Sequence, residues 1–544
     1  MHRLPSICFA LLLLLPSLAG AVEIFEIQGS GEASPLAGAR VETEGVVTAV
    51  GPAGFFMQTP VARADADEAT SNGIYVFTGS VPAVRAGDVV RVTATVAEFF
   101  GLTELTTPTI TVTSSNSAVP AAAMLQPGDA TLERFEGMLV QVSNGTAAAG
   151  TDRFGAVKAV ASAVRPFREP GIEAPGLPGL PVWDGNQEIF EVQTDAFGAA
   201  RPAVVGGARI HVAEGPLGYS FGSYEIWPLR FEFTNLAFPR PVRPAQSNEL
   251  TIGSQNLERF SANDPRFEAV SKHIREMLRA PDVVAVQEVD TLGTLQALAD
   301  RIRSDDATIS YRARLVEGND PGGIDVGFLV RDRVELLSVE AWGREDTWIA
   351  PGATAPAPLH DRPPLVLRAI AGGVPFTVIA VHLRSLIDIE NERVRAKRHE
   401  QALRLSRYID SLQDADPQAR IAVVGDFNAY EFTDGYVDVL GQLTGSPDPA
   451  GALQPASDEI EPNLTNHVSR LPATERYSYL FEGSAQVLDH ALTSAAWTQN
   501  VQGLEYARTN ADAPDSANAI SDHDGLVLYI RIAAAPTRRR AIGR

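Results

Sequence analysis

The stretch Ile421-Ala422-Val423-Val424-Gly425-Asp426-Phe427-Asn428 decides the fold class of the C-terminal half of this chain. Its first half is an apolar, largely β-branched run, which is typical of a strand buried on both faces. A carboxylate and an amide follow that run directly. Because polar side chains in a core are costly unless they are satisfied, a buried strand that ends in Asp426 and Asn428 indicates a site at the edge of a sheet.

The same arrangement recurs along the C-terminal half. Strands are predicted at Leu250–Gln255, Asp282–Val286, Val326–Val330, Phe376–Val381 and Ile421–Val424, and amphipathic helices at 267–277 and 394–412. Polar residues follow three more of these strands, and two later motifs add others: Asn256, Gln287-Glu288, His382, Leu488-Asp489-His490 and Ser521-Asp522-His523. The alternation of strands and helices predicts a mixed α/β domain with its site at strand ends.

The residue types at these strand ends favour a divalent metal ion. Carboxylate and amide oxygens are hard ligands that suit Mg²⁺, with Ca²⁺ or Mn²⁺ as alternatives, whereas a zinc site is expected to contain more His or Cys. Ions of this kind often act on phosphate groups. We therefore predict metal-dependent phosphate chemistry.

The ordered set of motifs resembles the endonuclease/exonuclease/phosphatase superfamily, which includes deoxyribonuclease I, apurinic endonucleases and neutral sphingomyelinases. The resemblance covers Glu249 to Ile532, with matching phrases at Gln255-Asn256, Gln287-Glu288-Val289, 325–331, Arg362-Pro363-Pro364-Leu365, His382-Leu383-Arg384-Ser385, Gly425-Asp426-Phe427-Asn428, Leu488-Asp489-His490 and Ser521-Asp522-His523. It implies an α+β chain whose C-terminal domain is a four-layered α/β sandwich of two packed sheets flanked by helices.

The resemblance also implies which residues bind the metal and the water. Glu288 is the expected metal ligand, with Asn256 beside it. Asp522 is expected to hold a second ion or to support the first. Asp426 orients or deprotonates the attacking water, and Asn428 donates a hydrogen bond to the phosphate. Taken singly, a motif such as Gly-Asp-Phe-Asn could equally be an Asx turn.

Two histidines have implied roles as well. His523 pairs with Asp489, which raises its pKa so that an imidazolium faces the scissile phosphate. His382 helps to protonate the leaving oxygen, and Asp325 is its expected carboxylate partner. Arg362 matches an arginine that contacts the phosphate. As single residues, each histidine could instead be a satisfied core group, and Ser-Asp before a histidine could be a helix cap.

Residues 1–21 are typical of a secretory signal peptide. A basic start is followed by the apolar run Ile7 to Leu15 and by the small residues Ala19-Gly20-Ala21, which predicts a mature start near Val22. A buried N-terminal strand or helix is the alternative. The expected location is the periplasm or the medium, and the only cysteine, Cys8, lies inside the signal.

Residues 22–116 are predicted to form an OB-fold-like β domain. Five short β runs fall in this span, and phrases between Ile27 and Val76 resemble the domain that precedes the catalytic domain in some secreted bacterial nucleases. The aromatic residues Phe55, Phe56, Tyr75 and Phe77 could stack on bases. However, residues 30–115 contain four arginines, no lysine and nine carboxylates, so we favour aromatics as barrel core over a phosphate-binding groove.

The remaining boundaries follow from composition. Residues 117–235 are a second β-rich region of unknown role, 236–248 a Pro-rich linker, 249–533 the catalytic domain and 534–544 a basic tail. The formal net charge of −22 argues against a protein that coats nucleic acid by bulk charge attraction.

The leading hypothesis is a secreted or periplasmic metal-dependent nuclease that cleaves DNA, and RNA as a further candidate, with little sequence preference. Nucleic acid is then the expected partner, and no stable membrane association is expected because no exposed aromatic hairpin is evident in the sequence. A sphingomyelinase-like phosphodiesterase or a phosphatase of the same superfamily is the alternative enzyme. A binding protein with a degenerate catalytic domain is the alternative from another class. Oligomeric state and endo or exo mode are left open.

Overall fold

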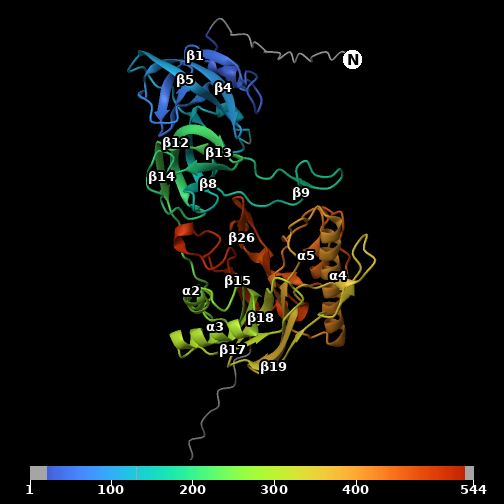
Figure 1. The fold of residues 1–544 in the computed structure, drawn as a ribbon. Coiled ribbons are helices and arrows are strands. Elements are labelled where there is room, and N and C mark those ends of the chain that lie inside the picture. Colours follow the sequence, from blue (N-terminus) through green and yellow to red (C-terminus); the bar gives the residue numbers. More distant parts are fainter. Residues whose placement is uncertain (1–20, 130, 533–544) are drawn as a thin grey trace, which may run out of the picture.

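The computed structural model describes residues 21–129 and 131–532, which form three domains stacked in chain order. Figure 1 shows the first β domain at one end of the molecule, the second β domain below it and the mixed α/β domain at the other end. All of the predicted signal peptide except Ala21, and the whole predicted basic tail, lie outside the described residues. Within the described part of the chain, no helix combines the length and hydropathy needed to cross a membrane.

The first β domain is a closed barrel that follows the short helix α1. Its strand order is β1-β2-β3-β5-β4, and β3 and β5 run parallel. The elements are α1 (Ile24–Gln28), β1 (Arg40–Val50), β2 (Gly54–Gln58), β3 (Gly73–Phe77), β4 (Val89–Phe99) and β5 (Leu102–Ser114). The five predicted strands and the small barrel are therefore confirmed, while the assignment to the OB fold stays a prediction.

The barrel aromatics divide between two faces because neighbouring residues of a strand point in opposite directions. Phe55 lies in the barrel core, as expected. Phe56 and Tyr75 are also buried, but they pack against Trp227 of the second β domain, with ring centroids 5.2 and 5.8 Å away. Phe77 is 42% exposed, so its assignment to the core was wrong.

The second β domain repeats the strand order of the first. Its seven-stranded sheet has the order β14-β12-β13-β11-β8-β7-β6, and an additional β12–β7 pairing joins five strands into a ring of order β7-β8-β11-β13-β12. In this ring β11 and β13 run parallel, as β3 and β5 do in the first barrel. The elements are β6 (Ala123–Met124), η1 (Glu133–Phe135), β7 (Leu139–Ala147), β8 (Ala156–Val160), β9 (Ile172–Glu173), β10 (Val182–Trp183), β11 (Phe190–Gln193), β12 (Arg209–Ser220), β13 (Ser223–Ile226) and β14 (Arg230–Thr234).

The predicted Pro-rich linker is not a free spacer, because it packs on the α/β domain. Arg240 forms an isolated β-bridge with Arg508, and Val242 is buried. Arg243 donates two hydrogen bonds of 2.9 Å to the carboxylate of Glu249. These contacts fix the entry of the chain into the third domain.

The α/β domain contains two six-stranded sheets. One has the order β17-β18-β16-β15-β30-β29 and the other β19-β22-β23-β24-β28-β25. The strands of the first are β15 (Glu249–Phe260), β16 (Val283–Val289), β17 (Tyr311–Leu315), β18 (Asp325–Arg331), β29 (Val501–Tyr506) and β30 (Leu526–Arg531). Those of the second are β19 (Glu335–Ala341), β22 (Leu365–Ala371), β23 (Val374–His382), β24 (Ile421–Asp426), β25 (Thr465–Asn466) and β28 (Asp489–Thr493).

Helices cover the outer faces of both sheets, which gives the four layers that were predicted. One core lies between the sheets and includes Ile252 and Val424. A second core joins the first sheet to α2 and α3, and a third joins the second sheet to α4 and α5. The helices and short elements are α2 (Phe267–Lys272), η2 (His273–Met277), α3 (Leu292–Asp305), β20 (Thr347–Trp348), β21 (Ala357–Pro358), α4 (Glu392–Ala415), α5 (Val439–Thr444), η3 (His467–Arg470), η4 (Ala473–Glu475), β26 (Tyr479–Phe481), β27 (Ser484–Gln486), α6 (Ala495–Thr498) and η5 (Asp515–Ala517).

Candidate active site

The predicted site residues meet where the central strands of the two sheets end. Strands β15 and β16 are parallel, with Asn256 beside Gln287, and β23 and β24 are parallel, with His382 beside Asp426. Parallel strands bring their carboxyl ends to one edge of a sheet, and the two sheets face each other across the core. Polar ends of four strands therefore converge on one place.

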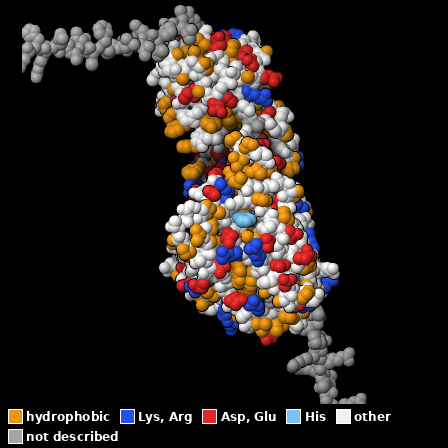
Figure 2. Space-filling model, turned by 90° about the vertical axis from the view of Figure 1, so that its right-hand side faces the viewer, with side chains coloured by type: hydrophobic (Ala, Val, Ile, Leu, Met, Phe, Trp, Pro, Cys, Tyr) orange, Lys and Arg blue, Asp and Glu red, His pale blue; other side chains and the backbone are white. Residues whose placement is uncertain are grey.

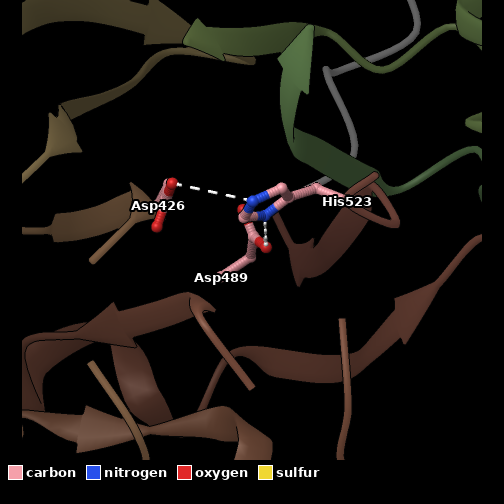
Figure 3. Close-up of side chains that lie close together, drawn as sticks. All are labelled: Asp426, Asp489 and His523. Carbon is pink, nitrogen blue, oxygen red and sulfur yellow. Dashed lines mark hydrogen bonds and ion pairs between the residues drawn. The ribbon is translucent and has the colours of Figure 1, made fainter. Parts of the chain in front are cut away.

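A hydrogen-bonded Asp–His pair forms one side of the site. Asp489 Oδ2 lies 2.7 Å from Nδ1 of His523, and Figure 3 shows the imidazole between Asp489 and Asp426. The His523 carbonyl accepts hydrogen bonds from Gln255 Nε2 at 3.0 Å and Asn510 Nδ2 at 2.7 Å, which fix the backbone here. The predicted pairing of His523 with Asp489 is confirmed.

The environment of His523 favours its charged form. Burial opposes the imidazolium, but the charges of Asp489 and Asp426 outweigh burial and raise the pKa of His523 to about 10. Its free Nε2 lies 4.0 Å from Asp426 Oδ2. A protonated Nε2–H is therefore held at the edge of the carboxylate cluster.

Asp426 occupies the centre of the site and is almost fully buried. Its Oδ1 accepts a 2.8 Å hydrogen bond from the Asn428 backbone, and Asn256 Nδ2 lies 3.2 Å from its Oδ2. Burial is the main reason that the pKa of Asp426 is raised to about 7. Asn428 and Glu288 have positive φ angles of 47° and 61°, which are uncommon for residues other than glycine.

His382 lies on the other side of Asp426 and differs from His523. Its Nε2 is 3.6 Å from Asp426 Oδ2 and 3.8 Å from Glu288 Oε1. Burial, followed by the charges of Arg362 and His523, lowers the pKa of His382 well below its usual value. A neutral imidazole is therefore expected here in the free protein.

The predicted partnership of His382 with Asp325 was wrong. His382 Nδ1 is buried without a hydrogen-bond partner among the described residues. Asp325 instead accepts a 2.8 Å hydrogen bond from the backbone of Gly318. Its carboxylate is committed to closing the loop before β18, so it does not orient the histidine.

Arg362 lies beside His382 and holds the chain that follows it. Its Nε donates to the His382 carbonyl at 3.2 Å, and its Nη2 to the Leu383 carbonyl at 2.8 Å. Nη1 lies 3.5 Å from Asp320. These contacts occupy most of the guanidinium donors, and the predicted contact with phosphate stays a prediction.

Asp522 and two residues that sequence reasoning missed line the solvent side. Asp522 is half exposed, with Oδ1 3.9 Å from His523 Nε2. The ring of Tyr479 lies 4.9 Å from the His523 ring, and burial raises its pKa to about 12. Glu258 has a raised pKa because of burial and the nearby charge of Asp522. Tyr479 belongs to no recognised motif. Only its position ten residues before Asp489 could have indicated that it lies near the site.

The site fits a divalent cation by its donor set. Asn256 Nδ2 donates hydrogen bonds to Glu288 Oε1 and Asp426 Oδ2, each 3.2 Å long, and so holds two carboxylates close together. Carboxylates gathered in a buried place require a compensating positive charge. Ligand atoms of Asp426, Asp489 and His523 also lie within 4.8 Å of one another, a group able to hold an ion. The Asp489–His523 hydrogen bond already uses two of those atoms, so Glu288, with Asn256 beside it, fits the ion better.

Comparisons with known proteins identify two regions of the chain. The Endonuclease/Exonuclease/phosphatase family matches residues 253–523. A domain of unknown function (DUF8508) matches residues 101–236, which include the second β domain. No curated protein matches the chain.

Several solved structures are similar to this chain over about half of its length. A humanized TDP2 of D. rerio carrying 14 mutations is 18% identical and has a TM-score of 0.35; the match covers 52% of this chain and 98% of that one. The human Nocturnin catalytic domain is 16% identical with a TM-score of 0.35, covering 53% and 98%. An endonuclease/exonuclease/phosphatase family protein of Bacteroides thetaiotaomicron is 15% identical with a TM-score of 0.35, covering 52% and 94%.

The family match spans every candidate catalytic and metal-binding residue, from Asn256 to His523. The two packed sheets, the helices outside them and the strand-end site agree with it. The C-terminal half of this chain belongs to the endonuclease/exonuclease/phosphatase family.

Proposed function

We propose that this protein is a secreted, Mg²⁺-dependent phosphodiester hydrolase that acts as a nuclease on DNA, and on RNA as a second substrate. The observation that carries the proposal is the arrangement of His523, Asp489 and Asp426. A charged imidazole that is oriented by one carboxylate faces a second, buried carboxylate at 4.0 Å. Such a pair holds a proton donor and a proton acceptor next to each other.

Each side chain then has a definite task. Asp426 accepts a proton from the attacking water, because its raised pKa makes it a stronger base than an exposed carboxylate. His523 donates a hydrogen bond to a phosphoryl oxygen from Nε2, since Asp489 holds Nδ1. Neutral His382 is placed to hydrogen-bond the leaving oxygen. Glu288 and Asn256 would hold Mg²⁺, which when bound offsets the charge on the phosphoryl oxygens.

Nucleic acid as the substrate is supported by the domains that precede the catalytic one. Two five-stranded barrels of the same strand order precede the catalytic domain, the second of them in contact with it, and small barrels of this kind often bind single strands. Figure 2 shows basic and acidic side chains interspersed over the visible face of the catalytic part. Substrate binding is therefore expected to depend on contacts at the site more than on overall charge.

One observation favours a second candidate, a phosphodiesterase acting on lipid. Phe99, Phe100 and Phe221 at two hairpin ends are 58%, 68% and 91% exposed, and the rings of Phe100 and Phe221 are stacked with centroids 5.9 Å apart. The expectation that the chain has no exposed aromatic hairpin was therefore wrong. Aromatic side chains at exposed turns can enter the interface of a bilayer.

An activity screen tests the proposal. The purified protein is incubated with single-stranded DNA, duplex DNA, RNA, sphingomyelin vesicles and a phosphomonoester, each with Mg²⁺ and with EDTA. We expect oligonucleotide products that disappear with EDTA. Release of phosphocholine without cleavage of nucleic acid would establish the lipid candidate, and release of inorganic phosphate alone a phosphatase.

A further inference from the structure

A segment of the second barrel, residues 165–187, docks beside the active site, and we name it the strap. Arg168 N donates to Ala485 O at 2.9 Å, and Ala485 N donates to Pro166 O at 3.0 Å. Asn186 Nδ2 donates to Ser484 Oγ at 2.7 Å. Figure 1 shows the part that carries β9 reaching out from the second barrel above α5. The strap thus extends the β26–β27 hairpin of the catalytic domain.

The strap also contacts the loop that follows the catalytic strand β24. Gly171 N donates to Thr433 O at 3.3 Å. Gly435 has φ 81° and a Cβ there would lie 2.6 Å from Ile172, so only glycine allows this approach. The guanidinium of Arg168 stacks on Tyr430, 4.8 Å from the ring centroid.

The strap touches the β26–β27 hairpin and the loop after β24, and both segments also carry residues at or next to the catalytic site. The β26–β27 hairpin begins with Tyr479, whose ring lies 4.9 Å from that of His523. Tyr430 is separated from Asn428 by one residue. The strap therefore lies at the edge of the catalytic centre.

A cleft of about 310 Å³ lies between the strap and these loops. Its lining is aromatic on several sides and includes Trp183, Tyr430, Tyr436 and Phe481. Phe481 is 54% exposed, so its ring is accessible to a ligand in the cleft. The side-chain amide of Gln486 also lines the cleft and makes no hydrogen bond to the described part of the chain.

The chemistry of this lining fits one part of a nucleic acid. Three carboxylates, of Glu173, Glu390 and Asp434, line the cleft beside a single arginine, Arg168. Its guanidinium already donates to the carbonyls of Glu169 and Gly171, so the net negative charge disfavours a phosphate group. An uncharged, planar group that stacks on aromatic rings and hydrogen-bonds an amide satisfies the same surface. An acyl chain would leave the amide and carboxylates without partners.

We propose that this cleft binds an unpaired base next to the phosphodiester that is cleaved, so that the second barrel takes part in substrate selection. The inference rests on the proposed function. Binding of a base in this cleft would give a function to the strap, which belongs to the second barrel and not to the catalytic domain. The inference also predicts that single strands are better substrates than duplexes.

Phe481→Ala tests the cleft with two matched substrates. One is oligothymidylate, and the other is an oligomer of the same length and charge in which every nucleotide lacks its base. We expect wild type to have a higher kcat/KM on oligothymidylate, and Phe481→Ala to reduce that ratio about ten-fold, in keeping with loss of one base stack. Phe154→Ala, an equally exposed phenylalanine of the second barrel outside the cleft, should leave the ratio unchanged.

Binding measurements separate this inference from the proposed function. Fluorescence anisotropy of labelled oligothymidylate is measured with His523→Asn in the presence and absence of Phe481→Ala. Weaker binding on loss of Phe481 supports the cleft even if no substrate is hydrolysed. Equal binding, equal preference for both oligomers, or an effect of Phe481→Ala on sphingomyelin hydrolysis alone would overturn it.

Discussion

The two β barrels share one strand order but differ in the loop between their second and third strands. In the first barrel this loop, residues 59–72, folds back on its own domain, where Asn72 Nδ2 donates to Asp65 at 3.0 Å. In the second barrel it spans residues 161–189 and contains the strap. Among the described residues, no hydrogen bond or ion pair joins the first barrel to the catalytic domain. The second barrel makes several, including the Arg165–Asp512 pair at 2.8 Å.

The difference shows that this loop adds contacts with the catalytic domain to those that the second barrel makes through Thr151, Lys158 and Gly206. Both domains share one strand order. Connecting loops carry little of the core and can change length without loss of the fold. We therefore expect changes in the second barrel and its strap to affect the catalytic domain, and changes in the first barrel to remain local.

The largest loss of activity is expected from a substitution at the catalytic centre, and the effects of changes in the two barrels can be compared with it. His523→Asn should lower kcat by about 10²- to 10⁴-fold, because a positioned proton donor is lost. The circular dichroism spectrum should stay that of wild type. His467→Asn is the matched control, since His467 is a buried histidine bonded to Thr493 at 2.8 Å and outside the site. Similar activity losses in both variants would refute the role of His523.

A large effect is also expected on metal binding in the catalytic domain. Glu288→Gln should weaken the Mg²⁺-dependent rise in Tm and shift the Mg²⁺ midpoint of activity upward, because a charged ligand is removed. EDTA should abolish activity in wild type. Glu136→Gln removes a buried carboxylate from the junction of the two barrels and should leave both readouts unchanged. A Mg²⁺ midpoint that moves with Glu136 and not with Glu288 would place the ion elsewhere.

The loss of stability caused by breaking one ion pair in each barrel should differ, and this loss is of intermediate size. Arg165 and Asp512 form an ion pair whose side chains are only 7% and 6% exposed. Arg165→Met leaves the carboxylate buried and should lower the free energy of unfolding by about 3–5 kcal/mol. In the first barrel, Arg63 and Glu44 pair at 3.3 Å near the surface, and Arg63→Met should cost about 0–1 kcal/mol.

Urea denaturation with tryptophan fluorescence measures both variants. A double-mutant cycle with Asp512→Asn isolates the pair from other effects of Arg165. If the two arginine variants are equally stable, the second barrel is no more firmly coupled to the catalytic domain than the first.

The smallest effect concerns the junction between the barrels. Glu136 is fully buried, and burial followed by the charge of Glu133 raises its pKa to about 8 from 4.5. A raised folded-state pKa means that the native protein keeps a proton that the unfolded chain releases. Stability should therefore fall as pH rises from about 4.5 to about 8, and remain lower above that range.

Glu136→Gln should flatten this slope. The variant is expected to be more stable than wild type at pH 9, with the difference shrinking as the pH falls to 5, in urea titrations at both values. Glu42→Gln, the same change at an exposed position, is the control. A wild-type urea midpoint that does not change with pH would show that Glu136 is ionised throughout.

The sequence by itself determined the fold class and most of the site. Strands with polar residues at their ends are a local pattern, so Asp426, Asn428, Glu288 and His382 could be found from alternation and burial alone. The ordered motifs then identified the family, which the match to residues 253–523 confirms. The pairing of Asp489 with His523 followed from that resemblance.

Only the tertiary structure decided how these groups are partnered. Asp325 accepts a hydrogen bond from Gly318 and is not the partner of His382. The ring of Tyr479, which belongs to the β26–β27 hairpin, packs beside that of His523. The second barrel closes through the β12–β7 pairing, and Arg165 finds Asp512, which lies 347 residues further along the chain. The physical reason is that such contacts join segments far apart in the chain. Residue periodicity records which face of an element is buried, but not which distant element covers it.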